Sequence, residues 1–289
     1  MLGAIIGDIV GSIYEFDHDV PKDFNLLQKG MRLTDDSLLT IAVAKTIVSN
    51  YPLSYDNDSI KKFKTDLINN FVDMWKNNKR AGFGGRFYTW CSMVNAGLPS
   101  SPYNSYGNGS AMRTSPVGWV ASSIEEVKTL SKIVSEVTHN HIEGIKGAEA
   151  VSMCIYLARN GYTKEQIKEV MIKDYYPEIQ SYESIESLKE SFTDSVTCQD
   201  TVPEAIYCFL ESESLEDAIR NCVHLGGDCD TTGAMAGAIA EAYYHKDELS
   251  SLETEFLAIM IPSWASELVL NFHKTIRSTK YKSLSKFLE

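Results

Sequence analysis

Acidic residues gather at two places far apart in the chain, each just before a segment with helical spacing of apolar residues. The first is Thr34-Asp35-Asp36, and the second is residues 228–231, Asp-Cys-Asp-Thr, which follow a Gly-Gly pair. A helix N-terminus needs only one capping side chain, although its dipole favours acids in the first turn. Capping therefore explains each motif only in part, and the surplus of oxygen atoms favours a second role as cation ligands.

A further acidic pair lies in the apolar N-terminal segment. Asp8 and Glu15 are seven residues apart, about two helical turns, so a continuous helix would place them on one face. Burying a carboxylate without a partner is costly, so these acids need partners unless Glu15 lies beyond the helix end in solvent. Together the acidic motifs predict an oxygen-only ligand set: Glu15, Thr34, Asp35, Asp36, Asp228, Asp230 and Thr231. Mg²⁺ or Mn²⁺ prefers such ligands, and so many carboxylates favour two ions.

Residues 81–118 are rich in Gly, Ser, Asn, Pro and aromatic residues and show no clear period, which predicts a long irregular loop. Such a loop in a helical domain is often functional. Its SYGNGSAMRTSP stretch could bind phosphate through backbone N–H groups, while Asn108 and Ser110 could bind hydroxyls and Arg113 a phosphate or carboxylate. An ordinary turn explains the same residues equally well, and a Walker A lysine is missing. His139 and His141 of the THNH motif are candidates for either structural or catalytic roles.

Helical spacing dominates elsewhere, and convincing alternating strands are absent. The spacing predicts helices near residues 5–13, 38–44, 127–137, 144–158, 163–171, 203–210 and 215–223, with another after residue 231. Gly3, Gly7 and Gly11 recur on one face of the first of these, and small residues fill the last, so we expect the two helices to pack closely. We predict a mainly α protein forming a single domain over residues 1–289, because the acidic motifs lie near opposite ends and must meet.

Composition excludes several classes of protein. The 289 residues carry 27 Lys and Arg against 39 Asp and Glu, a formal charge of −12, which disfavours nucleic acid as a partner. No apolar run reaches the roughly 18 to 20 residues of a membrane span, and the N-terminus lacks the basic region of a signal peptide. The six cysteines show neither CxxC nor zinc spacing. We therefore predict buried, reduced thiols in a cytoplasmic protein, and we expect a monomer.

The motifs resemble, in order, those of the ADP-ribosylglycohydrolase family, which includes dinitrogenase-reductase-activating glycohydrolases and ADP-ribosyl-acceptor hydrolases. They are GAIIGDIVGSIYEF, TDDS, SYGNGSAMRTSPVG, THNH and the segment from VPEAIYCF through GGDCDTTGAMAGAIAEAYY, which together extend from residue 3 to 244. The resemblance implies an all-α orthogonal bundle whose cleft binds two Mg²⁺ or Mn²⁺ ions. Two departures, Ser37 for a usual threonine and Cys229 for another, remove no expected ligand.

The resemblance also implies site residues. The metal ligands would be Thr34, Asp35, Asp36, Asp228, Asp230 and Thr231, with Glu15 as a further ligand or gate. The loop around ADP-ribose would be Ser105, Tyr106, Gly107, Asn108 and Gly109, and His139 would approach the phosphates or the distal ribose. Tyr103 or Tyr106 is a candidate to contact adenine.

The activity implied is hydrolysis of ADP-ribose from a modified protein side chain, arginine or serine, or from a small conjugate. Cleavage would occur at C1″ of the distal ribose, with Glu15, Asp35, Asp36 and Asp230 as candidates for the catalytic base. One alternative is a relative that only binds ADP-ribose or acts as an immunity protein. Another is an all-α Mg²⁺-dependent diphosphate enzyme, although the Asp35-Asp36-Ser-Leu-Leu sequence departs from the DDxxD motif of prenyl-diphosphate synthases.

Overall fold

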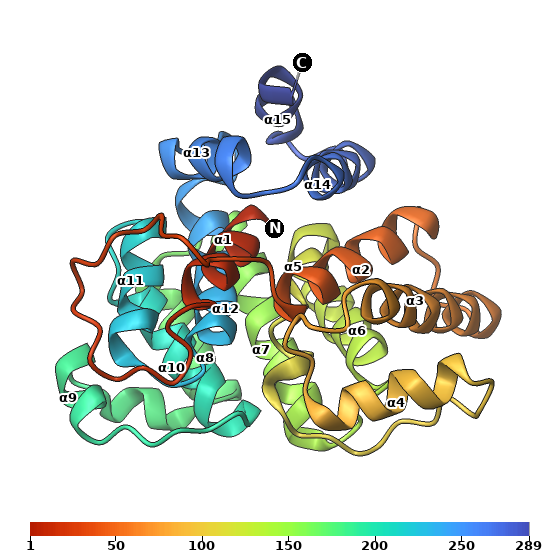
Figure 1. Cartoon of the computed structure of the whole chain (residues 1–289), viewed down its shortest axis with the longest axis horizontal. Helices are drawn as coiled ribbons and strands as arrows, with labels where there is room; N and C mark the ends of the chain where they lie inside the picture. The colour runs from red at the N-terminus through yellow and green to blue at the C-terminus, as the bar shows by residue number, and fades with distance from the viewer. Residues whose placement is uncertain (289) are drawn as a thin grey trace.

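The computed structural model describes residues 1–288, which form fifteen α-helices and two short 3₁₀ helices with no β-strand (Figure 1). The protein is therefore all-α, as the periodicity predicts. The elements are α1 (Leu2–Gly11), α2 (Asp35–Ser49), α3 (Asn57–Asn77), α4 (Gly85–Asn95), η1 (Asn108–Ser110), α5 (Ser115–Val120), α6 (Ile124–Ser135), α7 (Ile142–Arg159), α8 (Lys164–Asp174), η2 (Pro177–Ser181), α9 (Ile185–Glu190), α10 (Cys198–Leu210), α11 (Leu215–Leu225), α12 (Cys229–Tyr244), α13 (Ser251–Ile259), α14 (Ser263–Thr275) and α15 (Tyr281–Leu288).

Helices α1 and α12 form the most closely packed pair of the molecule. A Cβ atom at Gly7 would lie 2.0 Å from the carbonyl oxygen of Gly233, and one at Gly3 would lie 2.1 Å from that of Gly237. Only glycine permits this approach, so the small residues recurring every four positions let the two backbones touch. The predicted close packing of the first helix against the small-residue helix is confirmed, and it fixes the acids of α1 relative to those of α12.

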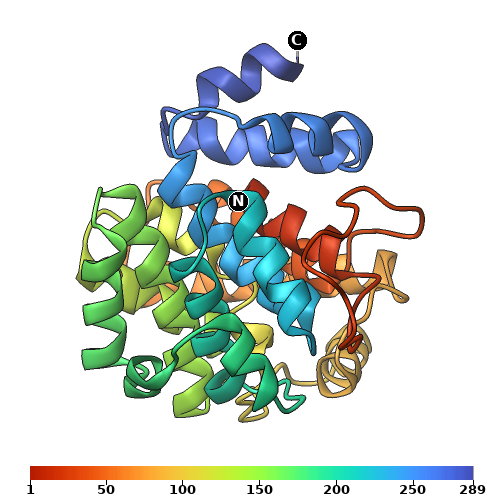
Figure 2. The same ribbon diagram turned by 90° about the vertical axis from the view of Figure 1, so that its left-hand side faces the viewer.

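The remaining helices surround this pair. α7, α10 and α11 pack against α12, while α2 packs against α1 and α3. In Figure 1, α2 to α6 lie on one side of the α1–α12 pair and α8 to α11 on the other. Helices α13, α14 and α15 form a separate layer above the others, seen from the side in Figure 2. The core is continuous through these elements and contains all six cysteines as buried free thiols, as predicted.

The segment predicted as a long irregular loop contains two α-helices, so that expectation is wrong over part of its length. Residues 85–95 form α4 and residues 115–120 form α5. Phe87, Trp90 and Cys91 are the buried residues of α4, and their spacing of three and one positions is helical. The surrounding Gly, Ser and aromatic residues hide this short apolar stripe from a composition-based reading.

Two predicted helix boundaries also differ. The N-terminal helix ends at Gly11, so Glu15 does not share a face with Asp8. Helix α10 begins at Cys198, five residues before the expected proline start, with Pro203 inside it. The Asp200 carboxylate accepts hydrogen bonds from the Ser195 and Thr197 hydroxyls at 2.6 and 2.8 Å, which stabilises the earlier start.

No helix among residues 1–288 has both the length and the apolar character needed to cross a membrane.

Candidate active site

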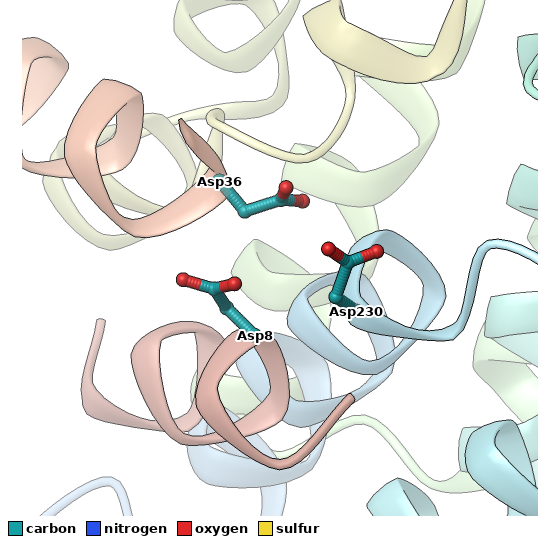
Figure 3. Close-up of side chains that lie close together, drawn as sticks. All are labelled: Asp8, Asp36 and Asp230. Carbon is teal, nitrogen blue, oxygen red and sulfur yellow. The ribbon is translucent and has the colours of Figure 1, made fainter. Parts of the chain in front are cut away.

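Three buried carboxylates from three helices converge at the centre of the fold. Asp8 of α1, Asp36 of α2 and Asp230 of α12 point toward one another (Figure 3), and one oxygen from each lies within 4.8 Å of the others. The residues are 0, 2 and 5 % exposed. Acids more than 190 positions apart in the chain therefore meet.

Asp8 holds the start of α2. Its carboxylate accepts hydrogen bonds from the backbone N–H groups of Thr34 and Ser37 at 2.9 and 3.1 Å. It also accepts from the Thr34 hydroxyl at 2.5 Å and from the Ser37 hydroxyl. Because both Asp8 oxygens are already used, Asp8 positions the Thr34–Asp36 turn and leaves the cation-facing role to its neighbours. The sequence signal was an acid inside an apolar helix, which showed a need for partners without identifying them.

A second acidic group shares Asp230 with the first. Glu15, Asp228 and Asp230 offer oxygens within 4.8 Å of one another. Gly226 and Gly227, at φ +97° and +70°, turn the chain sharply into α12. Glu15 is exposed, whereas Asp228 is buried, so this group opens toward solvent.

The side of the site nearest the glycine-rich loop is fixed through Asp228. Asn108 donates its side-chain N–H to the Asp228 carboxylate at 2.6 Å. Next to Glu15, the Phe16 N–H donates to the Gly227 carbonyl at 2.7 Å, which ties the segment after α1 to the turn before α12. The two acidic groups share Asp230, and their carboxylates form one compact cluster.

The aspartates of the site are crowded, and none of them forms an ion pair with another of residues 1–288; Arg32 lines the cavity and acts on Glu15. Burial and the nearby Asp8 raise the pKa of Asp35 to about 8, and burial raises that of Asp8 to about 6. Burial and neighbouring carboxylates also raise the pKa of Asp36 and of Asp230 well above the usual range. Such shifts mean that the charged forms lack compensation within the protein.

The residues present suit a divalent cation. Oδ1 of Asp36 is buried and has no hydrogen-bond partner among the described residues, which is costly unless a ligand satisfies it. The donors are all oxygens, which favours a hard cation such as Mg²⁺ or Mn²⁺ over zinc. Asp35 belongs to neither three-acid group, although it lines the same cavity as Thr34 and Thr231. The acidic cluster could bind metal.

The glycine-rich loop is held beside the acids. Gly107 forms an antiparallel bridge with Thr197, and the Asn108 N–H donates to the Val196 carbonyl at 2.9 Å. The Ser110 hydroxyl donates to the Gly144 carbonyl at 2.7 Å. The loop is thus held between α7 and the segment before α10, two parts of the chain that are distant from it in the sequence.

His139 faces this loop and is held from behind by a chain of contacts. Arg113 donates to the Thr138 hydroxyl at 2.8 Å, and that hydroxyl lies 2.8 Å from Nδ1 of His139. These contacts orient the ring with its other nitrogen, Nε2, toward the glycine-rich loop. A Cβ at Gly109 would lie 3.2 Å from this nitrogen. Burial and then Arg113 lower the pKa of His139 well below its ordinary value, so the ring is neutral at pH 7.

Two sequence candidates have structural contacts of their own. Arg113, expected to contact phosphate or carboxylate, is fully buried and donates to Thr138, and it also lines the cavity described next. His141 caps α7, since its Nδ1 accepts from the Glu143 N–H at 3.2 Å.

A cavity of about 340 Å³ connects these parts. Every residue of the predicted site lines it except Tyr106, which is 45 % exposed and packs edge-on against His141. Of the two tyrosines considered for adenine, Tyr103 is the one that lines the cavity. Lining residues that the sequence did not single out are Arg32, Leu39, Gly82, Gly84, Gly85, Arg86, Phe87, Met112 and Val196. Arg32 lies in the loop before α2, Leu39 lies within α2 and Val196 precedes α10, while the others lie within residues 81–118.

Comparison with known proteins agrees with this architecture. The profile of the ADP-ribosylglycohydrolase family matches residues 1–272. The chain is 24 % identical over 319 residues to "ADP-ribosylhydrolase ARH3" of Homo sapiens, covering 86 % of this chain and 85 % of that protein. It is 26 % identical over 269 residues to "ADP-ribosylarginine hydrolase Tri1" of Pseudomonas putida (strain GB-1), covering 84 % and 69 % respectively.

A solved structure described as an "ADP-ribosylglycohydrolase-related protein complex" has the same fold. It aligns with a TM-score of 0.69 at 19 % identity and covers 96 % of this chain and 97 % of its own. The all-α fold, the paired acidic groups and the profile match define the class, and the chain belongs to the ADP-ribosylglycohydrolase family.

Proposed function

We propose that this protein is a metal-dependent hydrolase that removes ADP-ribose from a modified arginine or serine side chain, or from a small ADP-ribosyl conjugate. The observation that carries the proposal is the pair of acidic groups sharing Asp230 beside a cavity lined by the 105–109 loop. Family membership supports glycohydrolase activity, and the names of the two relatives support ADP-ribosyl conjugates as the substrate class.

Two Mg²⁺ or Mn²⁺ ions would be held by Thr34, Asp35, Asp36, Asp228, Asp230 and Thr231, and when bound they would supply charge stabilisation and grip on ribose hydroxyls. The chain itself keeps the carboxylates in place through Asp8 and Asn108. The unpartnered Asp36 oxygen supports this assignment.

Glu15 is the best-placed proton acceptor among the candidates Glu15, Asp35, Asp36 and Asp230. It is the exposed member of its group, so it reaches both the cavity and bulk water. Burial, followed by repulsion from Asp228, raises the pKa of Glu15, which brings it nearer the range of an effective base. In the proposed step Glu15 takes the proton of the water that attacks C1″ through an oxocarbenium-like transition state. The bond from C1″ to the acceptor nitrogen or oxygen breaks, and that atom leaves with the acceptor and takes up a proton.

The 105–109 loop and His139 would orient the rest of ADP-ribose. Nε2 of His139 faces the loop, within reach of a phosphate or ribose oxygen or hydroxyl, and the Ser105 side chain lines the same wall. Tyr103, across the cavity beside His139, offers an aromatic face for adenine.

The decisive experiment incubates the protein with arginine-linked and serine-linked ADP-ribosyl peptides in parallel, with Mg²⁺, with Mn²⁺ and with chelator. Release of intact ADP-ribose that stops on chelation and returns with either ion supports the proposal and identifies the acceptor. Free phosphate or diphosphate would instead indicate a diphosphate hydrolase. Tight ADP-ribose binding without turnover would indicate a binding or immunity protein.

A further inference from the structure

A second acidic cavity lies behind the wall of the first. It has a volume of about 400 Å³ and lies between η2, α9 and the start of α10. Helices α9 and α10 are labelled in Figure 1. We call it the Glu204 groove. The segment between α9 and α10 separates the two cavities, because Val196 lines the first while Asp194 and Ser195 line the second. The lining residues are Glu178, Tyr182, Leu188, Ser191, Phe192, Thr193, Asp194, Ser195, Gln199, Asp200 and Glu204.

Glu204 is the feature of this groove that demands a partner. The residue as a whole is 8 % exposed, and it lines the groove without a hydrogen bond or ion pair to residues 1–288. Its neighbours are already engaged: Asp200 accepts from two hydroxyls, and Asp194 lies 3.3 Å from His18. The Glu204 oxygens are not among the fully buried unpartnered atoms, so this mostly buried carboxyl opens onto the groove, where a ligand can contact it.

The ionisable groups that line the groove are acids, apart from the Tyr182 hydroxyl, and the nearest basic side chain described above, His18, contacts Asp194 from outside the lining. Four carboxyl groups line the groove, and its lining contains no Lys, Arg or His. Burial and the nearby Asp200 raise the pKa of Glu204 to about 8, so the empty groove holds it protonated at pH 7. A cationic ligand would favour its ionised form.

The shape of the groove selects among cations. The only sets of three acids whose oxygens lie within 4.8 Å of one another, among the described residues, are those of the first cavity. The acids here are therefore spread more widely than one bare metal ion reaches. Leu188, Phe192 and the ring of Tyr182 supply apolar surface between them. Spread acids with apolar walls suit an aliphatic stem that ends in an ammonium or guanidinium group.

We propose that the Glu204 groove binds such an organic cation, with Glu204 as its main anchor. The cation has two possible sources with the same chemistry: a basic side chain near the modified residue of an acceptor polypeptide, or a free small molecule. The position of the groove behind the wall at Val196 makes the first source compatible with a substrate bound in the main cavity. Only the assignment of the cation to an acceptor polypeptide rests on the proposed function.

The test of binding uses agmatine, which has a guanidinium group, a four-carbon stem and an ammonium group. Calorimetry at 0.15 M salt compares the wild-type chain with Glu204→Gln, which keeps the size and neutrality of the protonated acid. The control is Glu267→Gln, which removes the same charge from an exposed position on α14. We expect saturable 1:1 binding to wild type and the control, and affinity lowered about tenfold or more in Glu204→Gln.

Non-saturable binding, or equal affinity in the wild type and Glu204→Gln, overturns the proposal. A second measurement keeps the test valid if the variant folds poorly. Agmatine binding to wild type at pH 7 should release a proton, seen as a difference in heat between phosphate and Tris buffers, and affinity should rise from pH 6.5 to 8.5. The other ionisable groups that line the groove are Glu178, Tyr182, Asp194 and Asp200, and His18 contacts Asp194 at 3.3 Å. Absence of proton release overturns the role of Glu204.

The source is decided by two ADP-ribosylated peptides that differ only in having lysines or alanines beside the modified residue. A higher kcat/KM for the lysine peptide that is lost in Glu204→Gln assigns the groove to the acceptor polypeptide. Equal kcat/KM in the wild type, with agmatine still bound, assigns it to a free cation. If neither peptide is hydrolysed, the proposed function fails, while the agmatine measurement still decides the groove.

Discussion

The two ends of α12 carry buried acids in opposite electrostatic settings. At the N-terminal end, Asp228 and Asp230 sit among other carboxylates, and burial followed by this repulsion raises the pKa of Asp230 well above its usual range. Near the C-terminal end, Glu241 pairs with Lys280 at 3.1 Å. Burial alone would raise the pKa of Glu241, but Lys280 and the Met1 amine outweigh it, and the pKa falls below the usual range.

This contrast separates a structural acid from one kept for a ligand. The helix dipole favours anions at the N-terminus and disfavours them near the C-terminus, so Glu241 is the acid that most needs a cation from within. Lys280 supplies it and also binds Glu253, and all three residues are 0 % exposed. The acids at the other end lack such a partner within the described residues, which leaves them available to an external cation.

The largest expected effect comes from removing the shared aspartate. Asp230→Asn should lower metal-dependent release of ADP-ribose by roughly 10³-fold, because several kcal/mol of charge stabilisation are lost. The metal-free variant should be at least as thermally stable as wild type, since one of several crowded carboxylates is gone. Turnover within tenfold of wild type would show that the two ends of α12 do not differ as we argue.

Removing the buried acid near the C-terminal end of α12 should lower stability and leave turnover unchanged. Glu241→Ala removes a partner of the buried Lys280, which should lower the free energy of unfolding by about 3 to 5 kcal/mol. Urea denaturation measures this change. Turnover per folded molecule, measured at a temperature where the variant remains native, should match wild type. A variant that is stable but inactive would contradict the structural assignment.

The packing of α1 against α12 can be tested with substitutions whose expected effects are smaller than those of Asp230→Asn and Glu241→Ala. Gly7→Ala places a Cβ 2.0 Å from the Gly233 carbonyl, and Gly11→Ala places one 2.3 Å from the Cα of Asp230. Each should cost about 1 to 3 kcal/mol of stability by overpacking.

Only the second substitution moves a proposed metal ligand directly, so Gly11→Ala should also weaken Mg²⁺ binding more than Gly7→Ala. Gly85→Ala, where a Cβ meets nothing within 4 Å, is the control and should leave stability nearly unchanged. Equal Mg²⁺ affinity in both packing variants would contradict the link between α1 and the position of Asp230.

The smallest expected effect is a pH dependence of stabilisation by metal. Acids whose folded pKa is raised destabilise the fold progressively as pH rises from the unfolded value near 4 to the folded value, about 8 for Asp35. Mg²⁺ binding to the ionised carboxylates offsets this loss. The rise in melting temperature caused by saturating Mg²⁺ should therefore be about 2 to 4 °C larger at pH 8 than at pH 6. A larger rise in melting temperature at pH 6 than at pH 8 would contradict the predicted direction of the pH dependence.

Local patterns in the sequence predicted some parts of this molecule well. The spacing of Gly3 and Gly7 predicted a helix face that another backbone can touch. Glycine permits this close approach whichever part of the chain supplies the partner helix. Thr34 and Asp36 indicated the N-terminus of a helix, and the structure confirms that Thr34 caps α2. Short helices were harder, since α4 is set by three apolar contacts among residues that favour loops.

The roles of other residues depended on what surrounds them. Asp8 could be recognised as an acid needing partners, yet only the packing of α1 against α2 shows that those partners are Thr34 and Ser37. Arg113 had the chemistry of a phosphate ligand, and the structure shows that it also donates to Thr138 from a fully buried position. Glu204 belongs to no motif with predicted chemistry, and only the fold shows that it is mostly buried and lines a groove.

The amino-acid sequence by itself determined the helical character, the small-residue faces and the supply of oxygen ligands, because these depend on neighbours within a few positions. Tertiary structure decided which acids face one another, which are neutralised by Lys280 and which stay open to a ligand. The physical reason is that the energy of a buried charge depends on burial and on charges brought near from distant parts of the chain.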